Sequence, residues 1–101
     1  MFTKNKVLLI IPVYNESKNI GNIINSLKKK NIDFLVINDG STDLTKKILI
    51  NKKVKFINHD YNKGYSFAIY TGINYAKKNY YKYLMTCDAD GQHSISDIEK
   101  L

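Results

Sequence analysis

The strongest fold signal in this chain is VLLIIPVYNE, residues 7–16. Residues 7–11 are leucine, valine or isoleucine without alternation, which is typical of a strand buried on both faces of a parallel sheet. A polar, turn-forming loop follows at once, at Pro12-Val13-Tyr14-Asn15-Glu16. Such a strand needs helices on both sides, so this stretch by itself favours a layered α/β architecture.

The same pattern of strand followed by helix repeats along the chain. The predicted elements are strands at 7–11, 34–37, 54–57 and 83–87 and helices at 17–30 and 65–78, with a short helix after residue 42. Alternation of this kind predicts an α/β fold with a mainly parallel sheet and right-handed crossovers, a Rossmann-like three-layer sandwich.

Local signals place the ends of the helices. Ser17 is the expected N-cap of the first helix, and Ser41 or Thr42 that of the short helix. That short helix is expected to bury Leu44 and Ile48. In the helix at 65–78, Ile69, Gly72, Ile73 and Ala76 share one face, and the two small residues allow close approach to a sheet. A further helix is expected to begin at Ser94 or Ser96.

Length and composition bound the class of protein. The chain has 101 residues, of which 44% are hydrophobic, so it forms one globular domain. No apolar run approaches the roughly 20 residues that span a membrane, and no signal peptide precedes the first strand. The single cysteine, Cys87, excludes an internal disulfide and a multi-cysteine zinc site. We therefore expect a reducing, cytoplasmic setting.

The net charge of +7 comes from 16 basic residues, all of them lysine. Arginine dominates specific reading of bases, so its absence argues against nucleic acid as a partner. The lysines are scattered and fall late in the predicted helices, which favours a solvated surface. Weak attraction to an anionic membrane is the alternative.

The polar residues gather after the strands. Asp39-Gly40-Ser41 follows the second strand, a polar loop ending at Gly64 follows the third, and Asp88-Ala89-Asp90 follows the fourth. In an open parallel sheet these ends share one edge, and ligands bind there. The sequence therefore predicts a site at this edge.

Asp88 and Asp90 are the most specific feature of that edge. Residues two apart on an extended chain point the same way, so the two carboxylates can converge on one hard cation. They supply only part of an octahedral shell, which leaves positions for phosphate oxygens and predicts a metal–diphosphate site. The alternative is an Asp-rich turn in which Asp88 caps a helix.

The other candidates also have two interpretations. Asp39 is either part of a turn or an acceptor for a ligand N–H or hydroxyl. Tyr14 either covers the core or forms a platform for a nucleobase. Glu16 either favours the first helical turn or lines the site. We interpret His59 and His93 as ordinary polar residues and Cys87 as a small buried one.

Four segments together resemble family 2 glycosyltransferases. They are residues 10–16 (IIPVYNE), 36–43 (VINDGSTD), the glycine-containing stretch 62–73, and 88–93 (DADGQH). The last is similar to the Asp-x-Asp motif of dolichol- and polyprenyl-phosphate sugar transferases. Asn38 departs from the family, which usually has an aspartate there, at a position that points away from the donor. The resemblance implies the nucleotide-binding half of a GT-A fold.

The resemblance also implies roles for single residues. Pro12, Tyr14 and Glu16 would line the nucleotide pocket, with Tyr14 near the base, while Ile37 and Asp39 would contact the base or ribose.

At the far side of that pocket, Asp88, Ala89 and Asp90 would reach the ribose and diphosphate. Asp88 and Asp90 would bind Mg²⁺ or Mn²⁺, which assists departure of the nucleoside diphosphate.

The implied reaction is inverting transfer of a sugar from a UDP- or GDP-sugar to a polyprenyl phosphate or a saccharide. The acceptor half and the catalytic base of the family are expected beyond residue 101, so no catalytic residue is assigned here. A non-catalytic nucleotide-binding or assembly module is the alternative. We also expect a cytoplasmic location, with peripheral contact at the cytoplasmic membrane face as an option. The open edge at the strand 83–87 predicts either a homo-oligomer or a marginally stable monomer.

Overall fold

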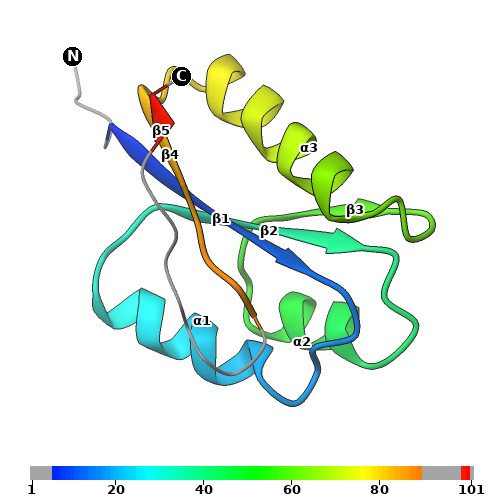
Figure 1. Ribbon diagram of the computed structural model, residues 1–101. Helices are drawn as coiled ribbons and strands as arrows, with labels where there is room; N and C mark the ends of the chain where they lie inside the picture. The colour runs from blue at the N-terminus through cyan, green and yellow to red at the C-terminus, as the bar shows by residue number, and fades with distance from the viewer. Residues whose placement is uncertain (1–5, 90–98, 101) are drawn as a thin grey trace.

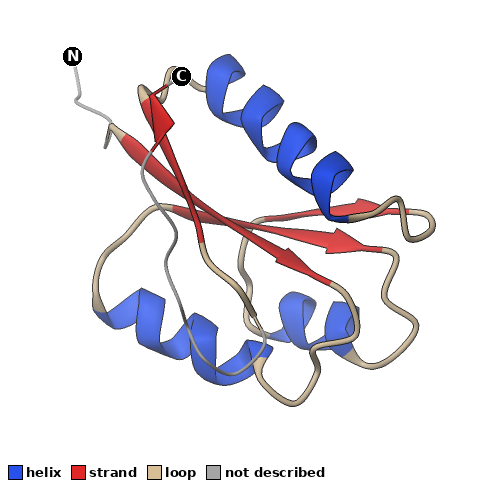
Figure 2. Cartoon of the chain, viewed as in Figure 1, coloured by secondary structure: helices blue, strands red, loops and turns tan. Residues whose placement is uncertain are grey.

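The computed structural model describes residues 6–89 and 99–100. Its strands are β1 (Val7–Val13), β2 (Phe34–Asp39), β3 (Phe56–His59), β4 (Tyr83–Thr86) and β5 (Glu99–Lys100), and its helices are α1 (Ile20–Lys29), α2 (Thr45–Asn51) and α3 (Tyr65–Lys78). The sheet order is β3-β2-β1-β4-β5, with β1 to β4 parallel and β5 antiparallel to β4. Helix α3 covers one face, and α1 and α2 cover the other (Figures 1 and 2). The predicted three-layer α/β fold is confirmed.

Strand β1 is central, which explains why its residues are apolar without alternation. Leu8 and Ile10 belong to the core beneath α3, while Leu9 and Ile11 belong to the core beneath α1 and α2. All four are at most 2% exposed. A strand buried on both faces has no solvent side on which a polar residue would be favoured.

Both helices on the α1/α2 face begin later than predicted. Helix α1 starts at Ile20 with Asn19 as N-cap, so the expected N-cap at Ser17 was wrong. Helix α2 starts at Thr45, and neither Ser41 nor Thr42 caps it. Its buried residues are Thr45 and Leu49, whereas Leu44 is 63% exposed. The prediction that Leu44 is buried was therefore wrong, because the helix starts one residue after it.

The strands also differ from the expectation, and β1 and β2 each extend beyond their predicted ends, to Val13 and Asp39. Strand β3 runs from Phe56 to His59 rather than from 54 to 57, since pairing with β2 aligns it so that His59 lies level with Asp39. Strand β4 is not an open edge along its whole length, because Tyr83 and Leu84 pair with β5. The helix expected from Ser94 or Ser96 lies outside the described residues.

Gly72 sets how closely α3 approaches the sheet. A Cβ at this position would lie 2.8–2.9 Å from three side-chain atoms of Ile10, which is fully buried. We expect Gly72→Ala to lower the free energy of unfolding by about 1–3 kcal/mol, since overpacking strains a close-packed core. Urea unfolding measures this effect, and in an Ile10→Ala background the penalty should largely disappear.

Gly21 in α1 is the matched control. A Cβ there meets only Lys52 at 3.6 Å and Ile48 at 4.0 Å, which are ordinary contacts. Gly21→Ala should therefore stabilise by about 0.5–1 kcal/mol through helix propensity. A stabilising Gly72→Ala would contradict the close approach of α3.

Candidate functional site

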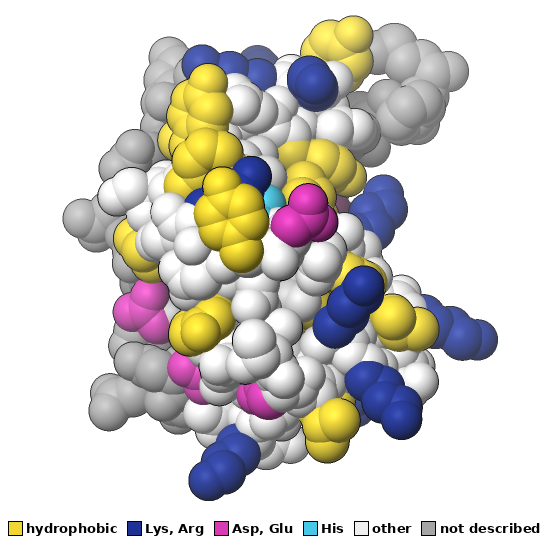
Figure 3. Space-filling view, turned by 90° about the vertical axis from the view of Figure 1, so that its right-hand side faces the viewer, with side chains coloured by type: hydrophobic (Ala, Val, Ile, Leu, Met, Phe, Trp, Pro, Cys, Tyr) yellow, Lys and Arg dark blue, Asp and Glu magenta, His cyan; other side chains and the backbone are white. Residues whose placement is uncertain are grey.

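The loops after β1, β2 and β3 meet at one edge of the sheet. Strand β1 lies between β2 and β4, so the chain moves from one side of β1 to the other when it enters β4. This is the topological switch point at which open α/β sheets bind ligands. Figure 3 looks onto the edge where β1, β2 and β3 end and shows hydrophobic side chains gathered beside a histidine.

A cavity of about 220 Å³ opens at this edge between the strand ends and the start of α3. Its lining residues come from the ends of β1 and β2, the loops after β1 and β3, and the start of α3: Pro12, Val13, Tyr14, Glu16, Asp39, Asn62, Gly64, Tyr65 and Ala68. Small-molecule sites usually have about 300–1,000 Å³, so this cavity suits one part of a ligand, such as a flat ring. Among the residues expected to bind a nucleotide, Pro12, Tyr14, Glu16 and Asp39 lie together here.

Two exposed aromatic side chains line this cavity. Tyr14 is 47% exposed and Tyr65 is 57% exposed. Tyr65 did not emerge from the sequence, where it only marked the start of a helix. Exposed aromatic rings beside a small cavity suit stacking on a planar ligand.

Ile37 and Glu16 were both expected to contact a nucleotide, but only Glu16 lines the cavity. The Ile37 side chain is fully buried in the core beneath α3 and does not line the cavity. Glu16 lines the cavity and accepts a hydrogen bond from the Asn19 side chain at 3.0 Å. We therefore retain Glu16 and do not retain Ile37 as a group that contacts a ligand through its side chain.

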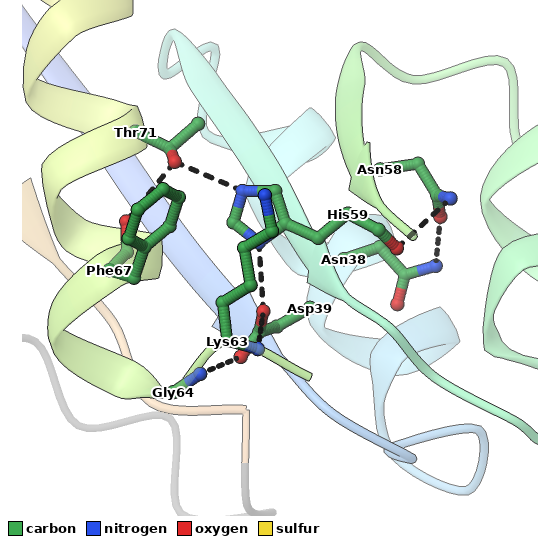
Figure 4. Close-up of polar contacts among 8 residues, drawn as sticks. All are labelled: Asn38, Asp39, Asn58, His59, Lys63, Gly64, Phe67 and Thr71. Atoms are coloured by element: carbon green, nitrogen blue, oxygen red, sulfur yellow. Dashed lines mark hydrogen bonds and ion pairs between the residues drawn. The ribbon is translucent and has the colours of Figure 1, made fainter. Parts of the chain in front are cut away.

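Asp39 is the most tightly held polar group of the site (Figure 4). Its Oδ1 accepts hydrogen bonds from the His59 ring at 2.8 Å and from the Lys63 N–H at 2.9 Å. Its Oδ2 accepts from the Gly64 N–H at 2.9 Å. Burial acts to raise the pKa of Asp39, but the bonds from His59, Lys63 and Gly64 outweigh it and lower that pKa. The carboxylate is therefore ionised at neutral pH.

His59 is not the ordinary polar residue that the sequence suggested. It ends β3, is only 7% exposed, and lies between the Asp39 carboxylate and the Thr71 hydroxyl, 3.0 Å from the latter (Figure 4). The ring of Phe67 packs edge-on against it at 5.4 Å. No local signal in the sequence could have found this contact, because it depends on the parallel register that aligns the end of β3 with Asp39.

Asn38 lies on the other face of β2. Neighbouring residues in a strand point to opposite faces, so Asn38 and Asp39 diverge. The Asn38 amide donates to the Asn58 side chain at 2.8 Å, and Asn38 does not line the cavity.

The loops after β1 and β2 are joined by side-chain hydrogen bonds. Asn15, at a positive φ of 54°, accepts from the Thr42 N–H at 2.7 Å and donates its own N–H to the Ser41 hydroxyl at 2.9 Å. Asp43 accepts from the Thr45 N–H at 2.9 Å and from the Ser17 N–H at 3.2 Å. These polar residues hold the two loops in place and so fix the shape of the cavity wall.

The Asp43 contacts predict a pH effect on stability. Burial acts to raise the pKa of Asp43, but hydrogen bonds from Thr45 and Ser17 outweigh it and lower the pKa from 3.8 to about 2. The stabilisation is therefore complete above pH 3.8 and is lost as the pH falls through about 2. We expect Asp43→Asn to cost no more than about 1 kcal/mol at pH 7, because Asp43 is exposed and the amide oxygen of asparagine still accepts a hydrogen bond.

Urea unfolding between pH 7 and pH 2 tests this effect. The gap between the wild type and Asp43→Asn should close toward the low end of that range. The exposed Asp60→Asn is the control and should leave stability within about 0.5 kcal/mol. A gap that stays constant with pH would contradict the role of the Asp43 carboxylate.

Asp88 leaves β4 at the same edge as the cavity. The Cys87 N–H still bonds to the Ile10 carbonyl at 3.0 Å, so Asp88 begins its loop beside β1. Asp88 is half-buried, while Ala89 and Cys87 are buried, as expected for Cys87. Asp90 lies outside the described residues, and within residues 6–89 no three metal-ligating side chains come together.

A larger cavity of about 410 Å³ lies at the opposite end of the sheet, where the strands begin. Lys28, Lys53 and Lys55 line it together with Asp33 and Tyr81. The Tyr81 hydroxyl donates to Asp33 at 2.8 Å, and burial together with this bond raises the pKa of Tyr81. None of the polar loops reaches it, so we place the candidate site in the smaller cavity.

Comparisons with known proteins show what this chain is similar to. A model of the family described as glycosyl transferase family 2 matches residues 8–101. A UDP-N-acetylglucosamine–dolichyl-phosphate N-acetylglucosaminyltransferase of Methanococcus voltae is 38% identical over 113 residues, covering 94% of this chain and 45% of that protein. An uncharacterized protein of Methanocaldococcus jannaschii is 37% identical, covering 97% of this chain and 41% of that protein. The chain thus spans less than half the length of these relatives.

Solved structures show the same fold. Glucosyl-3-phosphoglycerate synthase from Mycobacterium tuberculosis, in complex with Mn²⁺, UDP and glucosyl-3-phosphoglycerate, superposes with a TM-score of 0.73 at 18% identity. The match covers 85% of this chain and 34% of that one. The predicted GT-A type of fold is therefore confirmed.

Proposed function

The chain belongs to glycosyl transferase family 2, and from this we propose that it is the donor-binding half of an enzyme that transfers a sugar from a UDP- or GDP-sugar. One observation carries the proposal: Pro12, Tyr14, Glu16 and Asp39, from the ends of β1 and β2 and the loop after β1, line one cavity at the carboxyl edge of the sheet. Structural neighbours crystallised with UDP and Mn²⁺ or Mg²⁺ support a nucleotide there.

Different residues would bind different parts of the ligand. Tyr14 and Tyr65 would stack on the base, and Asp39 would accept a hydrogen bond from a base N–H. Asp88 and Asp90 would hold the divalent cation with the diphosphate; the carboxylate of Asp88 is a hard oxygen ligand that suits Mg²⁺ or Mn²⁺. When bound, the cation stabilises the negative charge that develops on the departing nucleoside diphosphate.

The acceptor is proposed from a relative. The Methanococcus voltae protein acts, by its name, on dolichyl phosphate, so a polyprenyl phosphate is our preferred acceptor and a saccharide the second choice. In either case, the bond from the anomeric carbon to the diphosphate breaks and one to the acceptor oxygen forms, with inversion. Within the described residues, no helix is long and apolar enough to cross a membrane.

A surface beside the cavity suits contact with a lipid bilayer. We define the α3 aromatic patch as Tyr61, Tyr65, Phe67 and Tyr70, each at least 43% exposed. The Lys63 ammonium lies 5.3 Å from the Tyr61 ring and 4.8 Å from the Phe67 ring. Aromatic rings and lysines together favour an anionic interface, and the chain carries a net charge of +7. We propose peripheral contact of this patch with the cytoplasmic membrane face.

A second contact proposal concerns copies of the chain. Among the described strands, β3 has no neighbour on its outer side, so two copies can pair along it. Light scattering tests this, and a monomer at high concentration would contradict it.

The test of the donor site is a thermal-shift titration with UDP and GDP, each with and without Mn²⁺. Ligand at about 100 times its dissociation constant should stabilise the fold by roughly 2.7 kcal/mol. The metal-dependent part of the shift should be lost in Asp88→Asn/Asp90→Asn and kept in the exposed control Asp60→Asn. No shift with either nucleotide would end the proposal that this chain binds the donor.

The membrane contact has its own test, co-sedimentation with vesicles. Binding to phosphatidylglycerol-containing vesicles and not to pure phosphatidylcholine is expected. Tyr61→Ser/Tyr70→Ser should lose this binding, while Tyr80→Ser, a change of an 85% exposed residue after α3, should keep it. Equal binding by both variants would contradict the patch.

A further inference from the structure

The Asp39–His59 pair bears on which nucleotide the cavity accepts, a question that depends on the donor-binding function proposed above. A carboxylate offers about four acceptor positions, two on each oxygen. His59 Nδ1 and the Lys63 N–H occupy both positions on Oδ1, at 2.8 and 2.9 Å. The Gly64 N–H occupies one position on Oδ2, at 2.9 Å. Among the described residues no further donor bonds to Asp39, so one acceptor position on Oδ2 remains for a ligand in the cavity that Asp39 lines.

The chemistry of the pair fixes the direction of the His59 bond. The Asp39 carboxylate is ionised and can only accept, so His59 Nδ1 must donate a proton to it. On the other side of the ring, Nε2 lies 3.0 Å from the Thr71 hydroxyl, which itself lies 3.1 Å from the Phe67 carbonyl. The ring is thus held at both nitrogens by β2 and α3, and it holds the carboxylate in one orientation (Figure 4).

The burial of the pair makes this arrangement rigid. The side chains of His59 and Asp39 are 6% and 5% exposed. Water cannot readily replace any of the three donors, and an unpaired polar group here would be costly. A ligand must therefore match the single position that the protein leaves.

We propose that His59 is a positioning residue that restricts Asp39 to one acceptor position and thereby selects a uracil nucleotide over a guanine nucleotide. The imide edge of uracil presents one N–H, flanked by two carbonyl oxygens. Guanine presents two adjacent donors, N1–H and the 2-amino group, which pair best with a carboxylate that offers two positions. In this cavity, one guanine donor would remain unpaired against Asp39.

The first experiment is calorimetric titration of the chain with UDP and with GDP under the same Mn²⁺ concentration. We expect UDP to bind at least about tenfold more tightly, the size of effect that one unpaired buried donor produces. Tighter or equal binding of GDP would overturn this inference and leave the proposed donor site intact. Binding of neither nucleotide would overturn both.

The second experiment assigns the preference to the Nδ1 bond. His59→Asn keeps an amide donor near the position of Nδ1, whereas His59→Gln places it near Nε2, toward Thr71. We expect His59→Asn to keep the preference for UDP. We expect His59→Gln to reduce it to about threefold or less, because the released carboxylate can offer a second position.

The ratio of the two dissociation constants separates selection from stability. A merely structural role of His59 would lower the melting temperature of both variants without changing that ratio. An unchanged preference for UDP in folded His59→Gln would overturn the role of His59. Should His59→Gln fail to fold, His59→Ala takes its place: a preference reduced to about threefold or less would support the role, and an unchanged preference would overturn it.

Discussion

Replacement of Gly40 by alanine is expected to lower the free energy of unfolding by about 2–5 kcal/mol. Gly40 has a positive φ of 75°, and a Cβ built there would lie 2.3 Å from the Tyr61 carbonyl carbon and 2.4 Å from the Asn62 nitrogen. These are backbone atoms, so no side-chain rotation relieves the contact, and backbone strain adds to it. The loop that lines the cavity through Asn62 would have to move away from β2.

Gly64→Ala is the matched control for this change. Gly64 also has a positive φ, 99°, but a Cβ there would have no neighbour within 4 Å. Its cost should be limited to conformational strain, about 1–3 kcal/mol, because φ of 99° with ψ of 160° is a region that essentially only glycine adopts. Urea unfolding of the two variants measures the difference. Equal effects of both substitutions would contradict the close contact between the loops after β2 and β3.

Replacement of Asp39 by alanine is the second change with a large expected effect, about 3–5 kcal/mol. The substitution removes the acceptor of the hydrogen bonds from His59 and from the N–H groups of Lys63 and Gly64. Leaving these buried donors unpaired lowers the free energy of unfolding. For a chain of this size, each kcal/mol shifts the melting temperature by about 4–8 °C. Differential scanning calorimetry therefore resolves the effect easily.

The loss of stability in Asp39→Ala is expected to depend on pH. The pKa of Asp39 is lowered from 3.8, so its stabilisation is complete above pH 3.8 and is lost as the pH falls through the folded-state pKa. The gap between the wild type and Asp39→Ala should shrink under those acidic conditions. The exposed neighbour Asp60→Ala should change stability by no more than about 0.5 kcal/mol. Effects of equal size in the two variants would contradict the buried cluster.

The predicted boundaries were most accurate for elements with a strong hydrophobic pattern of their own. Helix α3 occupies residues 65–78 as predicted, and β1 begins at Val7 as predicted. Helix α1 and strand β3 differed at their ends. The N-cap of α1 is Asn19, whereas Ser17 was predicted. Strand β3 begins and ends two residues later than predicted, because it pairs with β2 in the register that aligns His59 with Asp39. The local N-cap preference of Ser17 did not decide where α1 begins, because the Ser17 N–H instead forms a tertiary hydrogen bond to Asp43.

The candidate site was predicted in part. Pro12, Tyr14, Glu16 and Asp39 were selected from their place after strands, and the structure brings them together at one cavity. Ile37 was selected by resemblance and lies in the core. Tyr65 was missed because it only marked the start of a helix. His59 was missed because it lies in a polar loop with no His or Cys at ligand spacing, which favoured an ordinary polar residue.

The sequence by itself determined the layered α/β architecture and the edge that carries the site. Both follow from apolar runs and from the polar loops after them, because hydrophobic periodicity and chain direction are local properties. Only the tertiary structure decided the partners of Asp39. His59 and Gly64 lie 20 and 25 residues away along the chain, and parallel pairing of β2 with β3 brings them to one carboxylate. Contacts between separate elements depend on register and packing, which no single segment of the chain encodes.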